Sequence, residues 1–466
     1  MHKTDFGLIG LGVMGKSISL NIADNGFDIS VYNRTEAGEA HITKNFINEN
    51  KSFKNIQDFT ELSAFVSSIK RPRKILIMIK AGAAIDSVIE QIIPLLDNDD
   101  IIIDGGNSHY KDTVKRTNYL ATKGLNFVGC GISGGEEGAR KGPSIMLGGT
   151  TEVYKHIAPI LEKIAAKDSN NKPCCTHIGT DGAGHFIKMV HNGIEYAEMQ
   201  LLAELYALLC KSLTNEEIAT LFSKWNSGSE SSYLLEITIA ILRKKENGSY
   251  VLDHVLDQAK SKGTGSWSSQ AALELGIPNT MILSSVFARY ISSFKDDRTQ
   301  LSKSIKPKIA SEKLDVTSLK SAYRFARLIN HQQGFKLIHE ASVNYNWKLN
   351  LSEITRIWTN GCIIRSQLME TCISIFKSNT DIFEDKTILN SLISEEKNTI
   401  TMLQYGLSQR VALDSFSSAY NYWVSMTTEN LPANLIQAQR DYFGAHTYQR
   451  KGMDKSQSFH TNWKKL

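Results

Sequence analysis

The chain has 466 residues, 41% of them hydrophobic and 22% charged, which is typical of a globular protein with two or three domains. Its formal net charge of +5 is mild for this length and points to anionic small molecules at least as readily as to nucleic acid, for which we would require a clustered basic stripe, so we expect no nucleic-acid partner. No apolar run is long enough for a membrane span, and the N-terminus runs straight into a strand-like segment, so we expect no membrane partner and no signal peptide. The six cysteines lack C-x-x-C spacing, and we expect them to be reduced thiols of a cytoplasmic protein.

The first elements predict a dinucleotide-binding unit. A buried strand over 6–9 is followed by a glycine loop, a helix to about Asn25 and a second strand over 29–32. A lone glycine motif also occurs in tight turns, but this strand–loop–helix–strand context favours a cofactor site, with the pyrophosphate on the helix N-terminus. The loop is Gly10-Leu11-Gly12-Val13-Met14-Gly15, in which the three glycines allow the turn, the approach of the pyrophosphate and close helix packing.

The end of the second strand indicates the type of cofactor. It reads Asn33-Arg34-Thr35, where chains that bind NAD usually carry an acidic residue for the ribose 2′-hydroxyl. A carboxylate would repel a 2′-phosphate, whereas an arginine can pair with it in a bidentate manner. Arg34 could also be a surface arginine, but its position relative to the glycine loop favours NADP.

The α/β pattern continues to about residue 181. We predict strands over 74–79, 101–103 and 126–129 and a helix over 83–96. The strands lead into polar or Gly-rich turns that contain Lys80, Asn107 and Ser133-Gly134-Gly135. Turn chemistry alone would explain some of these residues. Because ligands of a doubly wound sheet collect at the carboxyl ends of its strands, we expect these turns at the same edge as the glycine loop.

The segment 182–196 carries a polar helical face. Lys188, His191, Asn192, Glu195 and Tyr196 fall at i, i+3, i+4, i+7 and i+8, so a helix would place all five side chains on one side. A solvated amphipathic helix is the simpler interpretation of such a face. Two glycines at 182 and 184 instead favour close approach to other backbone.

Long helices follow, and they contain a weak internal duplication. A shift of 138 positions aligns Asn192 with Asn330 and maps Lys188 to Ala326, His191 to Ile329 and Glu195 to Gln333. The second copy could therefore keep the scaffold while lacking the polar face.

Two later segments supply further polar groups. A Gly-rich loop over 261–267 contains Lys262 and could hold an oxyanion or serve as a flexible connection, and Arg289 follows on a helix-like stretch. The C-terminal segment from 439 is rich in aromatic residues, His and Arg, without a helical period. Because this tail is so rich in aromatic residues, we expect it to pack on another surface, such as a partner chain.

Taken together, these motifs resemble the 6-phosphogluconate dehydrogenase family, NADP-dependent decarboxylating enzymes of the oxidative pentose phosphate pathway. The resemblance runs nearly end to end and implies a homodimer. It implies an α/β Rossmann-type domain over 1–181, a large all-α domain with an internal duplication over 182–435, and a tail over 436–466 that reaches the partner subunit. The resemblance rests on the motifs G-L-G-V-M-G, N-R-T, D-G-G-N-S, S-G-G-E-E-G-A-R, K-M-V-H-N-G-I-E-Y, K-G-T-G-S-W, F-A-R and Q-R-D-Y-F-G-A-H-T-Y.

The resemblance also implies roles by position. Lys188 would be the general base and then acid, and Glu195 the second acid. Lys80 and Asn107 would lie beside the cofactor. The family often has lysine where this chain has Ser266, and many members have serine at Cys130; neither departure removes an assigned group. The sugar acid would be held by Asn107, Ser133, Gly134, Gly135, His191 and Asn192, and its phosphate by Tyr196, Lys262, Arg289 and, from the other subunit, Arg440 and His446.

The chemistry follows from these groups. Oxidation of a secondary alcohol needs a base, and the resulting β-keto acid loses CO2 when its carbonyl is protonated, which a lysine can do in both steps. An acid must then protonate carbon. We see no ligand cluster for a metal and expect none. The alternatives are an NAD-dependent β-hydroxyacid dehydrogenase that does not decarboxylate, and a catalytically silent NADPH-binding dimer.

Overall fold

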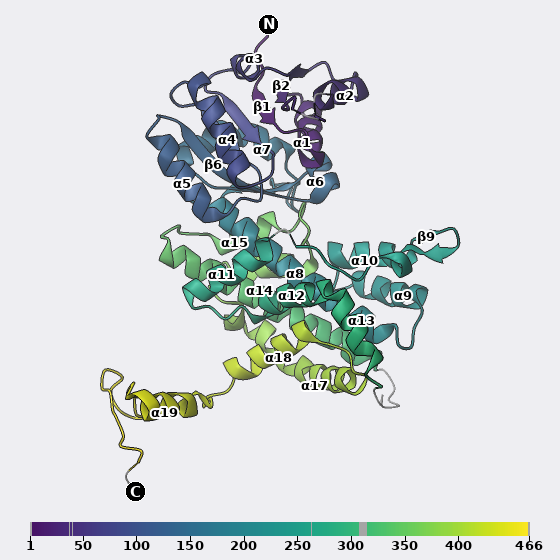
Figure 1. Cartoon of the computed structure of the whole chain (residues 1–466), viewed down its shortest axis with the longest axis vertical. Helices are drawn as coiled ribbons and strands as arrows, with labels where there is room; N and C mark the ends of the chain where they lie inside the picture. The colour runs from purple at the N-terminus through teal and green to yellow at the C-terminus, as the bar shows by residue number, and fades with distance from the viewer. Residues whose placement is uncertain (1, 37, 40, 262, 307–314, 465–466) are drawn as a thin grey trace.

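The structure is a computed structural model that describes residues 2–36, 38–39, 41–261, 263–306 and 315–464. Figure 1 shows a sheet domain at the N-terminal end, a large helical body beneath it, and a C-terminal segment that projects from the body. None of the helices within the described ranges is both long enough and apolar enough to cross a membrane.

The N-terminal domain contains an eight-stranded sheet in the order β3-β2-β1-β4-β5-β6-β7-β8. Adjacent strands are parallel except for the antiparallel pair β6 and β7. This confirms the predicted doubly wound α/β architecture. The strands are β1 Phe6–Ile9, β2 Ile29–Tyr32, β3 Ile56–Phe59, β4 Lys74–Ile77, β5 Ile101–Asp104, β6 Asn126–Ser133, β7 Ser144–Leu147 and β8 Cys175–His177.

Several boundaries in this domain differ from the sequence prediction, including that of β4, which ends at Ile77 and not at residue 79. The helix expected over 83–96 ends at Ile92 and continues as a 3-10 turn over Ile93–Leu95, because Pro94 lacks the N–H group that an α-helix needs. Strand β6 runs on to Ser133, so the predicted substrate turn directly follows a strand. The helices are α1 Val13–Asp24, α2 Ile42–Glu49, α3 Leu62–Ser67, α4 Ala83–Ile92, α5 Tyr110–Ala121, α6 Gly135–Lys141 and α7 Thr151–Ile164.

The helical body is built around two long helices that pack against each other, α8 over Ala183–Leu209 and α14 over Val316–Asn344. A short hairpin, β9 Lys245–Glu246 and β10 Ser249–Tyr250, projects from it. The other helices are α9 Asn215–Asn226, α10 Tyr233–Arg243, α11 Thr264–Leu275, α12 Thr280–Ser293, α13 Lys295–Lys303, α15 Leu351–Ile357, α16 Gln367–Ile375, α17 Lys386–Ser408 and α18 Asp414–Met426.

The element order within the body agrees with an internal duplication. Each long helix is followed by a helix capped by a polar side chain, Thr214 before α9 and Asn350 before α15. The two copies also meet at equivalent positions, because Ser232 and Ser366, which immediately precede α10 and α16, form an isolated antiparallel bridge. At the centre, Asn330 Nδ2 donates a 3.0 Å hydrogen bond to the carbonyl of Ile194.

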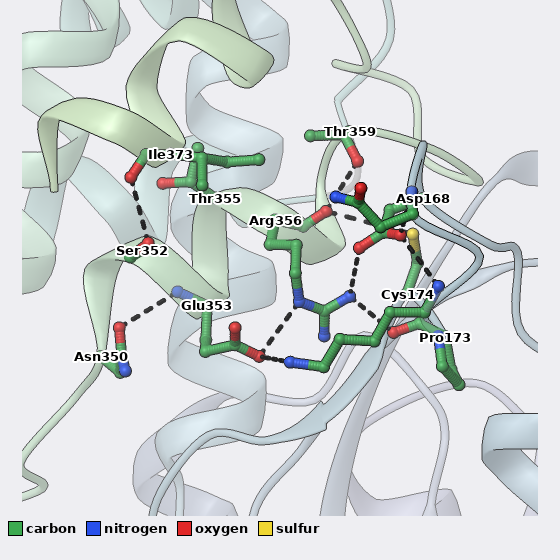
Figure 2. A network of polar contacts seen from close by, with 12 residues as sticks. Asp168, Pro173, Cys174, Asn350, Ser352, Glu353, Thr355, Arg356, Thr359 and Ile373 are labelled. Atoms are coloured by element: carbon green, nitrogen blue, oxygen red, sulfur yellow. Dashed lines mark hydrogen bonds and ion pairs between the residues drawn. The ribbon is translucent and has the colours of Figure 1, made fainter. Parts of the chain in front are cut away.

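A buried arginine joins the sheet domain to the helical body (Figure 2). Arg356 of α15 donates from Nη1 to Asp168 Oδ2 at 3.0 Å and to the carbonyl of Pro173 at 2.8 Å. Its Nε donates to Glu353, which also pairs with Lys172 at 2.9 Å. Because the pair of Arg356 with Asp168 is shielded from solvent, it holds the loop before β8 firmly against α15.

Glycines let the start of α8 pack directly onto the sheet. A Cβ at Gly184 would collide with the carbonyl oxygens of Gly129 and Met146, and a Cβ at Gly131 would collide with the Cβ of Lys188. Substitution at either position would push the helix away from strand β6. The predicted close approach of backbone at this helix is therefore confirmed, and it brings Lys188 to the carboxyl end of the sheet.

The C-terminal segment corrects one prediction. We expected no helical period from residue 439, but α19 spans Ala433–Gly444. Leu435, Ile436, Tyr442 and Phe443 fall at i, i+1, i+7 and i+8 and share one face of this helix, but the segment from residue 439 leaves out its first half. After α19 the chain turns back on itself, with a bridge between Tyr448 and Phe459. Figure 1 shows this segment projecting from the helical body.

Candidate active site

The glycine loop has the geometry that a bound pyrophosphate needs. Gly10 has a φ of 101°, and a Cβ at Gly15 would collide with the carbonyl of Gly10. A Cβ at Gly12 would meet nothing within 4 Å, so the backbone is open to a ligand at the start of α1. Val13 is exposed, Met14 is half-buried and Leu11 is buried. A pocket of about 890 Å³ extends from this loop to α6. These features fit a dinucleotide phosphate held at a helix N-terminus.

The end of β2 is tied to the loop through Asn33. Its Oδ1 accepts a 3.0 Å hydrogen bond from the backbone N–H of Leu11. Arg34 and Thr35 follow and are exposed, which fits both a group that meets a ribose phosphate and a surface arginine. Arg34 is engaged with Glu39, an acidic residue that we did not single out from the sequence.

The turns after β4 and β5 lie at the same edge of the sheet. Lys80 and Asn107 are both exposed there. The turn after β5 is fixed by the buried carboxylate of Asp104, which accepts from Gly106 N at 3.0 Å and from Ser108 Oγ at 2.6 Å. Asp104 thus shapes the loop that presents Asn107. The sequence motif D-G-G-N-S contained this residue, but its pattern did not distinguish an orienting group from a ligand group.

Helix α8 and strand β6 bring the predicted catalytic groups together. Ser133 Oγ lies 3.2 Å from His191 Nε2, and the other ring nitrogen of His191 lies 3.1 Å from Asn192 Oδ1 and 3.8 Å from Glu195 Oε2. Lys188 is 6% exposed and Glu195 has a side-chain exposure of 20%. The interpretation as a solvated amphipathic helix is therefore wrong, because the polar face is packed inside the protein.

The turn after β6 completes this side of the site. Gly134 and Gly135 have φ values of 138° and 63°, which residues with a side chain adopt rarely. A Cβ at Gly134 would lie 2.6 Å from the carbonyl of Gly361, in the helical body. The turn is therefore seated between the two domains, with its backbone close to the polar face of α8.

His191 is held in its neutral form. Burial lowers its pKa well below the usual range, and the nearby Lys188 ammonium acts in the same direction. The ring of Trp358 packs edge-on at 5.4 Å and limits its movement. A neutral imidazole has one donor and one acceptor nitrogen, which suits it to orient a substrate hydroxyl rather than to supply charge.

The opposite end of the α8 face carries the predicted phosphate groups. The guanidinium of Arg289 stacks on the ring of Tyr196 at 3.7 Å and donates to the carbonyl of Lys260 at 3.1 Å. Burial lowers the pKa of Arg289, an effect partly opposed by Tyr196 and Glu195. The predicted residue Lys262 lies outside the described residues.

One group in this region was missed from the sequence. Thr264, at the start of α11, is 3% exposed, and its Oγ1 accepts a 3.4 Å hydrogen bond from Asn192 Nδ2. It stands within the K-G-T-G-S-W motif, where attention to the lysine and glycines concealed it. Thr264 connects the Gly-rich loop to Asn192 on the polar face of α8.

The tail carries the last two predicted groups. Arg440 and His446 are exposed and belong to the projecting C-terminal segment. This segment is organised around the buried carboxylate of Asp441, which accepts hydrogen bonds from Thr447 N, Thr461 N and Trp463 Nε1. Burial would raise the pKa of Asp441, but these bonds and one from His460 outweigh that effect and hold it well below its usual value. The structure of one chain does not bring Arg440 or His446 to the α8 face.

The described part of the chain contains no group of three or more His, Cys, Asp or Glu side chains arranged to hold a metal ion. All six cysteines are free thiols.

Comparison with known proteins identifies the family. Residues 5–179 match the NAD binding domain of 6-phosphogluconate dehydrogenase, and residues 184–463 match the 6-phosphogluconate dehydrogenase C-terminal domain. The chain is 45% identical to the decarboxylating 6-phosphogluconate dehydrogenase of Escherichia coli K12, covering 99% of this chain and 100% of that protein. It is also 45% identical to the NADP(+)-dependent, decarboxylating 6-phosphogluconate dehydrogenase of Bacillus subtilis, with complete coverage of both.

A solved structure agrees with this assignment. Plasmodium falciparum 6-phosphogluconate dehydrogenase, studied in its apo form and in complexes with NADP+ and with 6-phosphogluconate, superimposes with a TM-score of 0.93 at 37% sequence identity. The match covers 98% of this chain and 100% of the Plasmodium chain. The fold, the arranged motifs and the full-length similarity lead to one conclusion: this chain belongs to the 6-phosphogluconate dehydrogenase family.

Proposed function

We propose that this protein oxidises and decarboxylates 6-phosphogluconate to ribulose 5-phosphate and CO2, with NADP as the hydride acceptor, in the oxidative pentose phosphate pathway. We further propose that Lys188 and Glu195 transfer the protons. The observation that carries the proposal is the meeting of the β6 turn and the α8 face, joined by the 3.2 Å contact between Ser133 Oγ and His191 Nε2. Relatives that match along their whole length and bear this activity in their names support it.

Lys188 is suited to the first proton transfers. It is buried at the carboxyl edge of the sheet, close enough to His191 for its charge to act on that ring. As base it would take the hydroxyl proton while the bound NADP accepts the hydride. The same amine, then charged, would donate to the carbonyl oxygen of the β-keto acid and promote loss of CO2.

Glu195 is suited to the last proton transfer. It lies two helical turns along the same face and keeps partial exposure, so it can exchange protons with solvent between turnovers. Loss of CO2 leaves an enediol, which becomes the ketone product when a proton is added to carbon. His191 and Asn192 would hold the sugar hydroxyls between the two acid–base groups, because their polar atoms line the intervening part of the helix face.

The phosphate end of the substrate would lie against Arg289 and Tyr196, with Lys262 from the adjoining loop. Binding energy from a phosphate is remote from the reacting carbons and can be used to orient them. We propose that Arg440 and His446 of a second copy complete this site. The projecting tail supports a homodimer, since its helix exposes Leu435, Ile436 and Phe443, with Phe443 72% exposed.

The resulting organisation is a cofactor domain over 1–181, a substrate and dimerisation domain over 182–435, and an exchanged tail over 436–466. We also propose that the enzyme works in the cytoplasm. The six free cysteines support this location, because thiols of secreted proteins are commonly paired.

A single assay distinguishes this proposal from its alternatives. Purified protein is mixed with 6-phosphogluconate and either NADP or NAD, and reduced cofactor and CO2 are measured together. We expect equal amounts of reduced cofactor and CO2. Cofactor reduction without CO2 would indicate a β-hydroxyacid dehydrogenase that does not decarboxylate, and no reduction with either cofactor would indicate a silent binding protein.

Mixed dimers test the shared site. Neither Lys188→Ala nor His446→Ala homodimers should be active, but chains of the two variants that are unfolded and reassembled together should regain activity. In a mixed dimer, one site would combine the intact Lys188 of one chain with the intact tail of the other. Mixing without reassembly is the control. Two different affinity tags, one on each variant, confirm that mixed dimers have formed. If those dimers do not regain activity, the tail does not complete the site of the other subunit.

A further inference from the structure

Glu39 places a carboxylate at the end of β2, beside the residues predicted to meet the adenosine ribose. Its Oε1 accepts a 2.8 Å hydrogen bond from Arg34 Nη2, and its Oε2 accepts a 3.0 Å bond from Arg34 Nε. The carboxylate thus occupies one whole edge of the guanidinium. That edge offers the paired N–H groups with which an arginine would bind a 2′-phosphate.

The same carboxylate is connected to the glycine loop. Asn33 Nδ2 donates to Glu39 Oε2 at 3.1 Å, while Asn33 Oδ1 accepts from Leu11 N. Only one side chain therefore separates Glu39 from the backbone that receives the pyrophosphate. In NAD-binding chains of this fold an acidic residue at this end of the strand accepts the ribose hydroxyls. Glu39 provides such a group from six residues beyond Asn33.

The local charge is unfavourable for a phosphate. Glu36 Oε2 lies 3.6 Å from Arg34 Nη1, so two carboxylates surround one guanidinium. Hydrogen bonds from Arg34 and Asn33 lower the pKa of Glu39, which keeps it ionised at neutral pH. A 2′-phosphate would have to displace Glu39 from Arg34 and would then remain close to the displaced negative charge.

We propose that Glu39 is a specificity-determining residue for the cofactor, which competes with the 2′-phosphate of NADP for Arg34 and accepts the ribose hydroxyls of NAD. The protein consequently uses NADP but discriminates only weakly against NAD. This inference rests on the proposed function for the identity of the cofactor. Arg34 has a side-chain exposure of 62%, so the pair with Glu39 can open when NADP binds, as exposed ion pairs are held weakly.

The test uses ligand fragments that isolate the adenosine end of the cofactor. Calorimetry on the full-length protein compares 2′,5′-ADP, which carries the distinguishing phosphate, with 5′-AMP, which does not. Glu39→Gln removes the charge and retains an acceptor for Arg34. We expect this variant to bind 2′,5′-ADP about tenfold more tightly, from the loss of competition and of like-charge repulsion, with no gain for 5′-AMP.

Two controls make the result specific. Glu152→Gln removes an exposed glutamate of the same domain, paired with Lys155 on α7, and should change neither fragment's affinity. In an Arg34→Ala background, Glu39→Gln should lose most of its effect if Glu39 acts by occupying Arg34. Equal changes for both fragments, or no change in 2′,5′-ADP binding by a folded Glu39→Gln protein, would overturn the proposal.

A kinetic measurement relates this inference to the reaction. With 6-phosphogluconate as substrate, Glu39→Gln should raise the ratio of kcat/KM for NADP to that for NAD by about tenfold. An unchanged ratio would contradict the assigned role. A wild-type protein that binds the fragments but oxidises no 6-phosphogluconate would refute the proposed function instead, so failure of the two proposals can be told apart.

Discussion

Helices α8 and α14 occupy equivalent positions in the two copies of the helical unit, yet they differ in how they use polar side chains. On α8, Lys188, His191 and Glu195 line the candidate site. The positions that correspond by the 138-residue shift on α14 are Ala326, Ile329 and Gln333, all 0% exposed. The scaffold therefore does not require an acid–base face, and the one on α8 is more simply explained by catalysis.

Gln333 shows what stands in the second copy at the position that corresponds to Glu195. Its Oε1 accepts a 3.0 Å hydrogen bond from Met281 N, and its Nε2 donates to Thr280 Oγ1 at 3.1 Å. The amide therefore satisfies the exposed end of α12, which otherwise leaves unpaired N–H groups. The same place on the helix serves packing in α14 and, by our proposal, proton transfer in α8.

Charged groups on α14 also belong to the structure. Arg327 is 1% exposed and donates from Nε to Glu198 Oε1 of α8 at 2.7 Å. It lies 3.6 Å from Glu230 as well, and these neighbours raise its pKa further despite the opposing effect of burial. This ion pair connects the two copies away from the candidate site, so the comparison separates charge used for packing from charge used for chemistry.

The largest expected effect comes from Lys188→Ala, which gives α8 the alanine found at the corresponding position of α14. Lys188→Ala should lower kcat by at least about a thousandfold, because one amine is proposed to act as base and acid. NADPH binding, followed by fluorescence, should stay within about twofold of wild type. Lys336→Ala removes a lysine of α14 that pairs with Asp381 and is the matched control. Lost cofactor affinity in Lys188→Ala would assign the lysine to the cofactor instead.

The reverse substitution, at Arg327, gives α14 the residue found at the corresponding position of α8. Arg327→Met introduces the residue found at Met189 and leaves Glu198 buried without its main partner. Removal of one member of a buried pair typically destabilises a protein by about 3–5 kcal/mol. Denaturant unfolding should show this loss, and adding Glu198→Gln should restore part of it. If Arg327→Met unfolds at the wild-type denaturant concentration, the pair does not hold the two copies together.

Much of this organisation was predictable from the sequence, for identifiable reasons. The glycine loop and the strands after it have local periodicity, and the five polar residues of α8 share one face through helix geometry alone. Helix α19 was missed because the aromatic segment from residue 439 begins inside it and leaves out Leu435 and Ile436, which complete its apolar face. Glu39 and Asp441 could not be assigned because their importance comes from contacts, with Arg34 and with the returning tail, that local sequence patterns do not encode.

A smaller effect is expected from Glu195→Gln, which introduces the amide of Gln333 into α8. The amide keeps the shape and hydrogen-bonding ability of the side chain but cannot deliver a proton to carbon. We expect kcat to fall about a hundredfold, within the range for loss of one general acid. The KM for NADP should be unaffected. Product analysis after decarboxylation provides the measurement, and an unchanged rate of ribulose 5-phosphate formation would remove Glu195 from the mechanism.

The smallest effect concerns Glu204, at the far end of α8 from the candidate site. Its carboxylate accepts hydrogen bonds from Ser415 N at 2.9 Å and Phe416 N at 3.2 Å, at the start of α18. Burial raises its pKa to about 7, against the opposing effect of these hydrogen bonds, and Asp414 adds a smaller increase. Because the folded-state pKa lies above the unfolded one, the stabilising contribution is complete at acidic pH and is lost as pH rises through about 7.

This linkage predicts a measurable pH dependence. Between about pH 6 and about pH 8, titration of Glu204 should lower the free energy of unfolding by about 1 kcal/mol. Glu204→Gln cannot titrate and keeps an acceptor for Ser415 N, so its stability should lack this component. The difference between the wild-type and variant unfolding curves at each pH isolates the contribution. Parallel curves would mean that Glu204 keeps one charge state across this range, and that the contact between α8 and α18 is insensitive to pH.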